Sequence, residues 1–263
     1  MPECAISDII DRVDAIRKVI APLGIKEDAS VVVVTGAGIS AESGIPTFRD
    51  KDGIWQKYNL EDVATPQGFY RNPDLVWQFY SQRRLDALKC EPNAGHKALV
   101  WLERYLEKRG RFLLVTQNVD GLHQRAGSKN IVTIHGSLFR TKCSNPSCSL
   151  QPFEDKETYF SGAPKCPECG SVLRPDVVWF GEYLDPHDEA LAREAILDCD
   201  IFIAVGTSGV VQPVASYVVL ASMAGATRIL VNLEPPANLE FFTSFYQGKS
   251  GEILPILFGH LQR

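Results

Sequence analysis

The strongest constraint on the fold is a series of short apolar runs, each followed at once by glycine or polar residues. The first run, Ser30–Thr35, consists mostly of valine and leads directly into a glycine-rich stretch. Similar runs occupy residues 112–116, 201–205 and 228–231. Continuous apolar runs of this length, rich in β-branched residues, indicate strands that are buried on both faces, as in a parallel sheet.

Helical patterns separate these runs. They cover residues 95–108, 187–198 and 214–224. Strands that alternate with helices predict an α/β fold with a Rossmann-like, open parallel sheet. Because ligands of such sheets bind outside the carboxyl ends of the strands, we expect the polar stretches that follow the runs to meet at one site.

Two segments interrupt this alternation, and neither contains an obvious sheet strand. Residues 46–84 are rich in aromatic side chains and helical in pattern, and residues 141–174 hold four of the seven cysteines. We therefore predict one Rossmann-like domain formed by residues 1–45, 85–140 and 175–263. The helical insertion and the cysteine module would together form a smaller lobe over the sheet.

The composition excludes several classes of function. The chain has 263 residues, of which 45% are apolar and 22% charged, and its formal net charge is −5. An acidic chain lacks the basic surface that dominates affinity for nucleic acid, so we expect no direct nucleic-acid partner. No apolar run approaches the roughly 20 residues that a membrane span needs, so we expect no membrane partner either.

Residues 1–24 have the pattern of an amphipathic helix that carries four acidic residues. Such a segment suits neither a secretion signal nor an acid-poor transit peptide. We expect a cytoplasmic location, with the nucleus or another reducing compartment as the alternative.

The glycine-rich stretch after the first run has the spacing Gly36-x-Gly38-x-x-Ala41. Glycines there would let the backbone approach a pyrophosphate, which the N-terminus of the following helix would favour. A tight structural turn is the alternative, since this pattern alone is weak. A dehydrogenase would also need a second strand ending in an acidic residue about 20 residues later, and none is present. We expect a dinucleotide that is held differently.

The cysteine module has the spacing of a metal site, with Cys143 and Cys148 in one pair and Cys166 and Cys169 in the other. Four thiolates can close a tetrahedral zinc site, and a closed site leaves no position for a catalytic water. We therefore predict structural zinc. The alternative is four unligated thiols.

Polar residues Gln117, Asn118 and Asp120 follow the second run, and His135 lies beside Gly136 at the end of a short apolar stretch. A histidine can act as a general base near neutral pH. A packed core histidine is the alternative for His135. His123 and His96 are weaker candidates, which we expect to be structural.

Taken together, these motifs resemble the sirtuin family. The likeness rests on the run GAGISAESGIPTFR from Gly36, on QNVDGLH from Gln117, on His135-Gly136 and on Gly206-Thr207-Ser208. It extends over residues 31–254, most of the chain, and the cysteine module lies where sirtuins carry theirs. The resemblance implies an NAD-dependent protein-lysine deacylase, which transfers the acyl group to ADP-ribose and releases nicotinamide.

The resemblance also implies roles for individual residues. His135 would be the general base. The NAD-binding residues would be Gly36, Ala37, Gly38, Ser40, Thr47, Phe48, Arg49, Gln117, Asn118, Asp120, Gly206, Thr207, Ser208, Asn232, Glu234 and Ser250. The segment from Val177 to Glu182 resembles the strand that pairs with an acyl-lysine peptide, which makes Val178, Trp179, Phe180, Gly181 and Glu182 candidate substrate contacts.

A further likeness is to the branch of the family that removes succinyl-type groups. Its features are Tyr80 and Arg83, three residues apart in a helical pattern over residues 73–88, and the small residue Ala64. Residues three apart lie on one face of a helix, and arginine matches a carboxylate with two parallel hydrogen bonds. The alternative is that Arg83 and Arg84 form a solvated basic face while Tyr80 packs in the core.

Three functions remain open from the sequence. The first is the deacylase, with acidic acyl groups preferred or with acetyl as its main substrate. The second is a mono-ADP-ribosyltransferase on the same scaffold. The third is a nucleotide-binding zinc protein without turnover, which the presence of His135 and the acyl-pocket residues disfavours.

Overall fold

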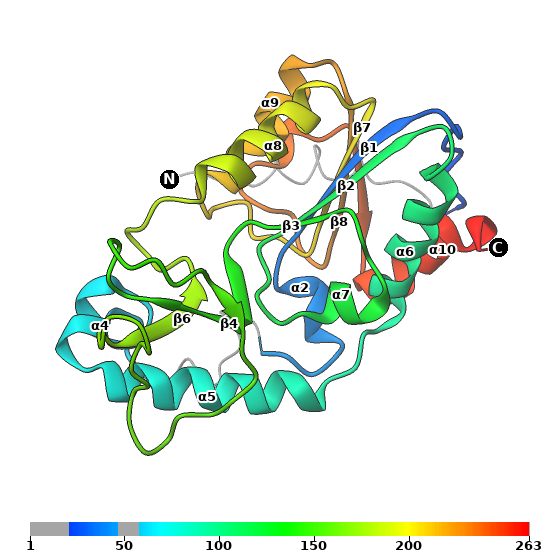
Figure 1. Ribbon diagram of the computed structural model, residues 1–263. Helices are drawn as coiled ribbons and strands as arrows, with labels where there is room; N and C mark the ends of the chain where they lie inside the picture. Colours follow the sequence, from blue (N-terminus) through cyan, green and yellow to red (C-terminus); the bar gives the residue numbers. More distant parts are fainter. Residues whose placement is uncertain (1–20, 47–57, 263) are drawn as a thin grey trace, which may run out of the picture.

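A six-stranded, fully parallel sheet forms the centre of the molecule (Figure 1). The computed structural model describes residues 21–46 and 58–262. The strand order is β3-β2-β1-β7-β8-β9. The strands are β1 (Ser30–Thr35), β2 (Arg111–Thr116), β3 (Ile131–Thr133), β7 (Ile201–Val205), β8 (Thr227–Asn232) and β9 (Ser244–Gln247). The α/β fold and all four predicted runs are confirmed, and β9 is an edge strand that the sequence did not indicate.

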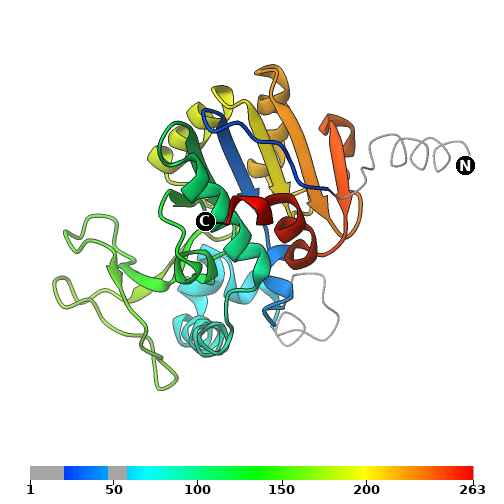
Figure 2. The ribbon, with the colours of Figure 1, turned by 90° about the vertical axis from the view of Figure 1, so that its right-hand side faces the viewer.

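Alternate valines of β1 face opposite layers of helices. Val31 and Val33 pack in a cluster with α6 (Ala94–Leu106) and α10 (Ser250–Phe258). Val32 and Val34 pack in a second cluster with α8 and α9, which are Pro186–Leu197 and Tyr217–Met223. Figure 1 shows these helix pairs on opposite sides of the sheet, and in the turned view of Figure 2 the red helix α10 lies in front of the strands. A strand buried on both faces therefore explains why the valine run is continuous rather than alternating.

The smaller lobe combines helices with a three-stranded antiparallel sheet. The helices are α3 (Leu60–Val63), α4 (Pro66–Arg71) and α5 (Pro73–Lys89), and the strands are β4 (Gly136–Cys143), β5 (Phe153–Glu154) and β6 (Leu173–Val177). These elements share a third hydrophobic cluster. The expectation that the cysteine module lacks strands is wrong. The strand β4 pairs with β6 across about 30 intervening residues, and this pairing is not visible in local periodicity.

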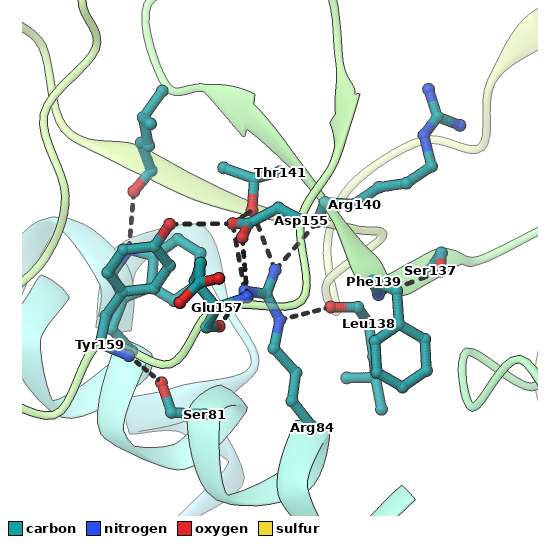
Figure 3. A network of polar contacts seen from close by, with 12 residues as sticks. Ser81, Arg84, Ser137, Leu138, Phe139, Arg140, Thr141, Asp155, Glu157 and Tyr159 are labelled. Atoms are coloured by element: carbon teal, nitrogen blue, oxygen red, sulfur yellow. Dashed lines mark hydrogen bonds and ion pairs between the residues drawn. The ribbon is translucent and has the colours of Figure 1, made fainter. Parts of the chain in front are cut away.

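A buried arginine fastens α5 to this small sheet (Figure 3). Arg84 has no exposed surface, and its guanidinium donates to the carbonyl of Leu138 at 2.6 Å, to Thr141 Oγ1 at 2.9 Å and to Asp155 Oδ2 at 3.1 Å. Tyr159 Oη also donates to the same carboxylate oxygen at 3.2 Å. Burial raises the pKa of Asp155, but the hydrogen bond from Thr141 and the charge of Arg84 outweigh it and lower that pKa. The ion pair thus fixes the rotation of α5 about its axis.

The remaining short elements connect these layers. They are α2 (Gly38–Ala41), α7 (Leu122–Ala126), η2 (Val214–Ser216), η3 (Leu239–Phe241) and η4 (Gly259–Leu261). Among the described helices, none has the length and apolar character to cross a bilayer. The amphipathic pattern in residues 1–24 falls largely outside the described residues.

Candidate active site and metal centre

The loops that follow β1 and β7 approach each other too closely for side chains. The amide of Gly38 donates to the carbonyl of Gly206 at 2.9 Å. A Cβ on Gly36 would lie 2.8 Å from that carbonyl oxygen, and a Cβ on Gly38 would lie 2.7 Å from the Cα of Gly206. Gly206 itself has a φ of +61°. Glycine is therefore required at all three positions, because its absent side chain lets two strand ends meet.

A cavity of about 270 Å³ opens beside this glycine contact. It lies at the carboxyl ends of the strands, where the topology predicts a ligand. Its lining comprises Gly38, Ala41, Glu42, Gly206, Val231, Asn232, Leu233, Gly248, Lys249 and Ser250. The predicted residues Gly38, Gly206, Asn232 and Ser250 are thus brought together. Glu234 is exposed and does not line the cavity.

The cavity has the chemistry of a nucleotide site. The side-chain Nδ2 of Asn232 donates to the carbonyl of Thr207 at 2.9 Å, which positions the loop after β7 at the cavity wall. Ser250 is buried at the first turn of α10, and its Oγ has no hydrogen-bond partner among the described residues. A buried polar atom without a partner indicates a site for a ligand group. Glu42 and Lys249 are lining residues that sequence reasoning missed. Lys249 adjoins the predicted Ser250, and Glu42 lies two residues after the predicted Ser40.

Polar side chains gather beyond the glycine contact. Asn118 Nδ2 donates to the carbonyl of Gly36 and to Ser40 Oγ, both at 3.1 Å. Asp120 is buried and accepts from the amide of Leu122 at 2.9 Å. Burial raises the pKa of Asp120, and hydrogen bonds from Leu122 and Ser40 act against that rise. Ser40, Asn118 and Asp120 therefore form one connected group, as three of the predicted cofactor residues should.

His135 links this group to the smaller lobe. Its Nδ1 lies 3.2 Å from the carbonyl oxygen of Gln117, and its own carbonyl accepts from the amide of Val178 at 2.9 Å. Burial lowers the pKa of His135, and the hydrogen bond to Gln117 offsets part of that shift. A neutral ring that donates from Nδ1 leaves Nε2 able to accept a proton.

Two further histidines lie buried beneath the site. The rings of His96 and His123 are 4.7 Å apart. His96 Nε2 is 3.4 Å from Ser40 Oγ, and His123 Nε2 is 3.0 Å from Thr35 Oγ1. Burial lowers the pKa of His96 to about 4. Both rings therefore support the site from within the core, in keeping with the structural role expected of them.

The three acyl-pocket candidates lie in the smaller lobe. Ala64 and Tyr80 belong to the third hydrophobic cluster, and Arg83 lies one helical turn beyond Tyr80 on α5. Burial lowers the pKa of Arg83, and the neighbouring Tyr80 and the charge of Asp120 offset part of that fall. Arg83 is thus electrostatically linked to the group around Asp120. Arg84 points into the small sheet instead, so the alternative of a shared solvated face is wrong for Arg84.

The segment predicted to pair with a peptide differs from a strand. The strand β6 ends at Val177, and a turn follows at Phe180 and Gly181. The amide of Phe180 donates to the carbonyl of Ala64 at 3.0 Å. The amide of Trp179 donates to Glu182 at 2.8 Å. These amides are satisfied inside the lobe, which is why the ladder does not continue past Val177.

The four module cysteines gather into one cluster. The sulfur atoms of Cys143, Cys148, Cys166 and Cys169 all lie within 4.8 Å of one another, and two of the distances are 3.5 and 3.6 Å. Tetrahedral zinc with Zn–S bonds of about 2.3 Å places its sulfurs about 3.8 Å apart. The cysteines therefore fit a structural zinc ion rather than two disulfides, in which sulfurs would be about 2 Å apart.

Three predicted residues, Thr47, Phe48 and Arg49, lie outside the described residues. Ala37 immediately precedes α2. Thr207 and Ser208 accept hydrogen bonds from the amides of Gly209 and Val210, at 3.2 and 3.5 Å. Both belong to the loop whose Gly206 meets Gly38.

Comparisons with known proteins agree with this arrangement. Residues 36–213 match the Sir2 family. An NAD-dependent protein deacylase of Pyrococcus furiosus is 45% identical over 244 residues, which cover 90% of this chain and 95% of that protein. The mitochondrial NAD-dependent protein deacylase sirtuin-5 of Canis lupus familiaris is 43% identical over 247 residues, covering 86% of this chain and 79% of that protein.

Solved structures give the same result. A Sir2 homologue in complex with NAD has a TM-score of 0.82 at 37% identity, and the match covers 94% of this chain and 97% of that one. A Sir2 protein bound to an acetylated peptide has a TM-score of 0.75 at 28% identity, with 95% of each chain covered. The chain belongs to the Sir2 family, the sirtuins.

Proposed function

We propose that this sirtuin is an NAD-dependent protein-lysine deacylase that prefers acidic acyl groups. One observation carries the proposal. His135 contacts Gln117, at the end of a strand of the parallel sheet, and also contacts Val178, beside the acyl-pocket candidates. A single potential base therefore joins the nucleotide side of the site to the substrate side. Relatives named NAD-dependent protein deacylase support the same activity.

The residues of the cavity and the glycine contact suit NAD. The glycines bring the two strand ends together beside the cavity, and Asn232 and Ser250 line the cavity that would hold the adenosine half. Asn118 and Asp120, with Gln117 and Ser40, would orient the nicotinamide half. NAD supplies the ribose carbon that takes the acyl oxygen and the ribose hydroxyl that then attacks the acyl carbon. Orientation of this kind can contribute several kcal/mol to lowering the barrier.

His135 would accept the proton of that ribose hydroxyl at Nε2. The carbonyl of Gln117 holds the proton of the neutral ring on Nδ1, so Nε2 is the free acceptor. Because burial lowers its pKa, the ring is neutral at physiological pH and ready to act as a base. The predicted contacts of residues 178–182 with a peptide would use the main chain and so give little sequence selectivity.

The acidic preference rests on Tyr80, Arg83 and Ala64. Tyr80 and Arg83 come from one face of α5, and Ala64 contributes only a methyl group to the same cluster. A guanidinium and a phenol hydroxyl can together bind a terminal carboxylate. A small residue at position 64 leaves room for a chain longer than acetyl. Succinyl, malonyl and glutaryl groups fit this description.

The zinc site would be structural and the partners would be acylated proteins. Four thiolates complete the coordination of zinc, so it would hold the smaller lobe together without touching substrate. The chain offers no reason to expect nucleic-acid or membrane partners, and thiolate ligands suit a reducing compartment such as the cytoplasm. The separate hydrophobic cluster of the smaller lobe supports a division into two parts, although it also includes Ala87, Leu138, Val177 and Trp179 from outside the predicted bounds of that lobe.

The test is one peptide series that carries acetyl, succinyl, glutaryl and long fatty acyl groups on the same lysine. We expect NAD-dependent loss of the acidic groups and release of nicotinamide only when acyl-lysine is present. Nicotinamide release without acyl-lysine, with ADP-ribose joined to protein, would favour a mono-ADP-ribosyltransferase. Mass spectrometry of peptide and nucleotide products separates the two.

The variant Arg83→Met tests the acidic preference itself. Loss of one partner of a buried charge pair costs about 2–5 kcal/mol, or roughly 30- to 3000-fold in kcat/KM for succinyl-lysine. Acetyl-lysine has no carboxylate, so its weaker turnover should change far less. If the wild type prefers acetyl peptides, or if the variant impairs both substrates equally, the enzyme is mainly a deacetylase.

A further inference from the structure

We propose that Trp179 is a positioning residue for acyl selectivity, acting through the hydroxyl group of Tyr80. The inference rests on the acidic-acyl preference proposed above and deepens it. The indole Nε1 of Trp179 donates a hydrogen bond to Tyr80 Oη at 2.9 Å. Both side chains are 3% exposed, so this bond lies in the interior of the smaller lobe.

The phenol oxygen of Tyr80 accepts a hydrogen bond from a buried donor. Trp179 supplies that donor, and the guanidinium carbon of Arg83 lies 5.8 Å from the centre of the Tyr80 ring. A phenol oxygen that already accepts one hydrogen bond keeps its own hydrogen to donate elsewhere. The bond from Trp179 therefore favours donation by Tyr80 toward the pocket, on the side of Arg83.

This arrangement defines the chemistry of the ligand. Tyr80 would present an O–H donor and Arg83 would present N–H donors, so the acyl pocket offers donors and no acceptor from these side chains. A carboxylate, which only accepts, satisfies both. The terminal amide of a neutral isostere carries N–H donors that such a pocket cannot accept, so it should bind less well.

Trp179 is itself fixed by a charged clamp. The guanidinium carbon of Arg174 lies 3.5 Å from the centre of the indole ring. Arg174 also donates to both carboxylate oxygens of Glu182, at 2.6 and 2.9 Å. Glu182 in turn accepts from the amide of Trp179 at 2.8 Å. The indole ring of Trp179 therefore stacks on the guanidinium of Arg174, whose charge is balanced by Glu182, and this stacking sets the direction of the indole N–H group.

The clamp also gives the side chains of two predicted substrate residues a role inside the lobe. Trp179 and Glu182 were expected to contact peptide, yet their side chains bind within the lobe. The side chain of Phe180 is instead 52% exposed. The turn thus points one side chain outward and uses the other two to support the acyl pocket from behind.

The experiment measures the ratio of kcat/KM for succinyl-lysine to that for acetyl-lysine on one peptide. Loss of a single neutral hydrogen bond should lower this ratio about 2- to 10-fold in Trp179→Phe. Trp77→Phe is the matched control, because Trp77 is buried in the same cluster and donates its indole N–H to the carbonyl of Leu173 at 2.7 Å. It should keep the wild-type ratio even though it also loses a buried bond.

A double-mutant cycle distinguishes positioning from loose packing. In a Tyr80→Phe background the hydroxyl is absent, so adding Trp179→Phe should not lower the ratio further. Multiplication of the two single effects would overturn the inference, and so would an equal loss for both substrates in Trp179→Phe. Should Trp179→Phe fail to fold, Glu182→Gln weakens the clamp instead, and a wild-type ratio in that variant would overturn the inference too.

Failure of the inference and failure of the proposed function give different results. If the wild type prefers succinyl and Arg83→Met removes that preference, the acidic pocket stands whatever Trp179 does. If the wild type shows no such preference, the pocket itself is wrong, and the inference about Trp179 fails with it.

Discussion

At the scale of single residues, the adjacent arginines Arg83 and Arg84 of α5 lie in different surroundings. Arg83 lies beside Tyr80, whereas Arg84 is fully buried against Asp155 and Thr141. Adjacent positions of a helix point about 100° apart, so one arginine can serve the site while the next holds the helix in place. The first of these roles is a proposal that rests on the resemblance to the family, and only packing reveals the second.

His135 carries the sharpest prediction at this scale. His135→Ala should lower deacylation about 10²–10⁴-fold while NAD binding persists, because a general base typically contributes this much. Steady-state kinetics and calorimetric titration with NAD check both parts. His260→Ala is a control outside the site and should keep wild-type turnover. A folded His135→Ala protein with wild-type turnover would exclude the assignment.

The pH profile tests the same residue independently. Burial lowers the pKa of His135, so its neutral form persists below the ordinary histidine value of 6.5. The rate should therefore fall only as pH drops below 6.5, as the ring takes up a proton. A kcat/KM profile whose acidic limb lies above pH 6.5 would contradict this.

At the scale of elements, the smaller lobe is assembled from segments that are distant in the sequence. The helix α5 contributes Arg84, β4 contributes Thr141, and the chain after β5 contributes Asp155. The cysteine cluster lies in the same lobe, with ligands near both ends of the loop between β4 and β6. Zinc and the buried ion pair would therefore both stabilise the region around β4 in the smaller lobe.

Zinc content follows from the cluster. We expect about one zinc ion per chain, and Cys166→Ser should lose the metal and unfold the smaller lobe at lower temperature. Cys199→Ser is the control, since Cys199 is buried in the second cluster and lies outside the four ligands. Metal analysis of the purified protein that detects no zinc would exclude the site.

The buried ion pair should be costly to break. Arg84→Met leaves the carboxylate of Asp155 buried without its partner, which typically costs about 3–5 kcal/mol of unfolding free energy. Arg71→Met removes the exposed ion pair with Asp62 and should cost less than about 1 kcal/mol. Denaturant unfolding of both variants compares them. Equal effects would show that Arg84 does not fasten α5.

At the scale of the whole molecule, every layer has its own core. Two clusters lie on the faces of the parallel sheet and a third fills the smaller lobe. The candidate site draws on all of these parts at the carboxyl edge of the sheet. The position of the smaller lobe relative to the parallel sheet thus depends on residues such as His135, which contacts both Gln117 and Val178.

Acid should destabilise the molecule through its buried histidines. The pKa of His96 is lowered from 6.5 to about 4, so the unfolded chain binds a proton more readily than the folded one as pH falls. Stability should therefore decline between pH 6.5 and about 4, by about 3 kcal/mol from this group.

Two variants separate the contribution of His96 to this loss of stability from that of other groups. His96→Gln should be less stable at pH 7 but should lose less stability on acidification, and His187→Gln, at an exposed position, should keep the wild-type slope. Urea unfolding at several pH values gives these slopes. A slope in His96→Gln equal to that of the wild type would contradict the prediction.

The sequence by itself determined four strands of the parallel sheet, the helices between them and the family. A β-branched run such as Ser30–Thr35 indicates a strand buried on both faces, and the paired cysteines have a spacing that suits a metal. Such features are local, so periodicity and spacing reveal them. The motifs around Gly36 and Gln117 could also be identified from the sequence, because each lies within a few residues of the end of a predicted strand.

Tertiary structure alone decided the pairing of β4 with β6, the edge strand β9 and the direction of Arg84. It also decided that the indole N–H of Trp179 donates to Tyr80 Oη. These partners are separated by about 15 to 100 residues, and no local pattern records which distant groups will meet. Their contacts depend on how the layers pack, since packing brings each buried donor to an acceptor from another element.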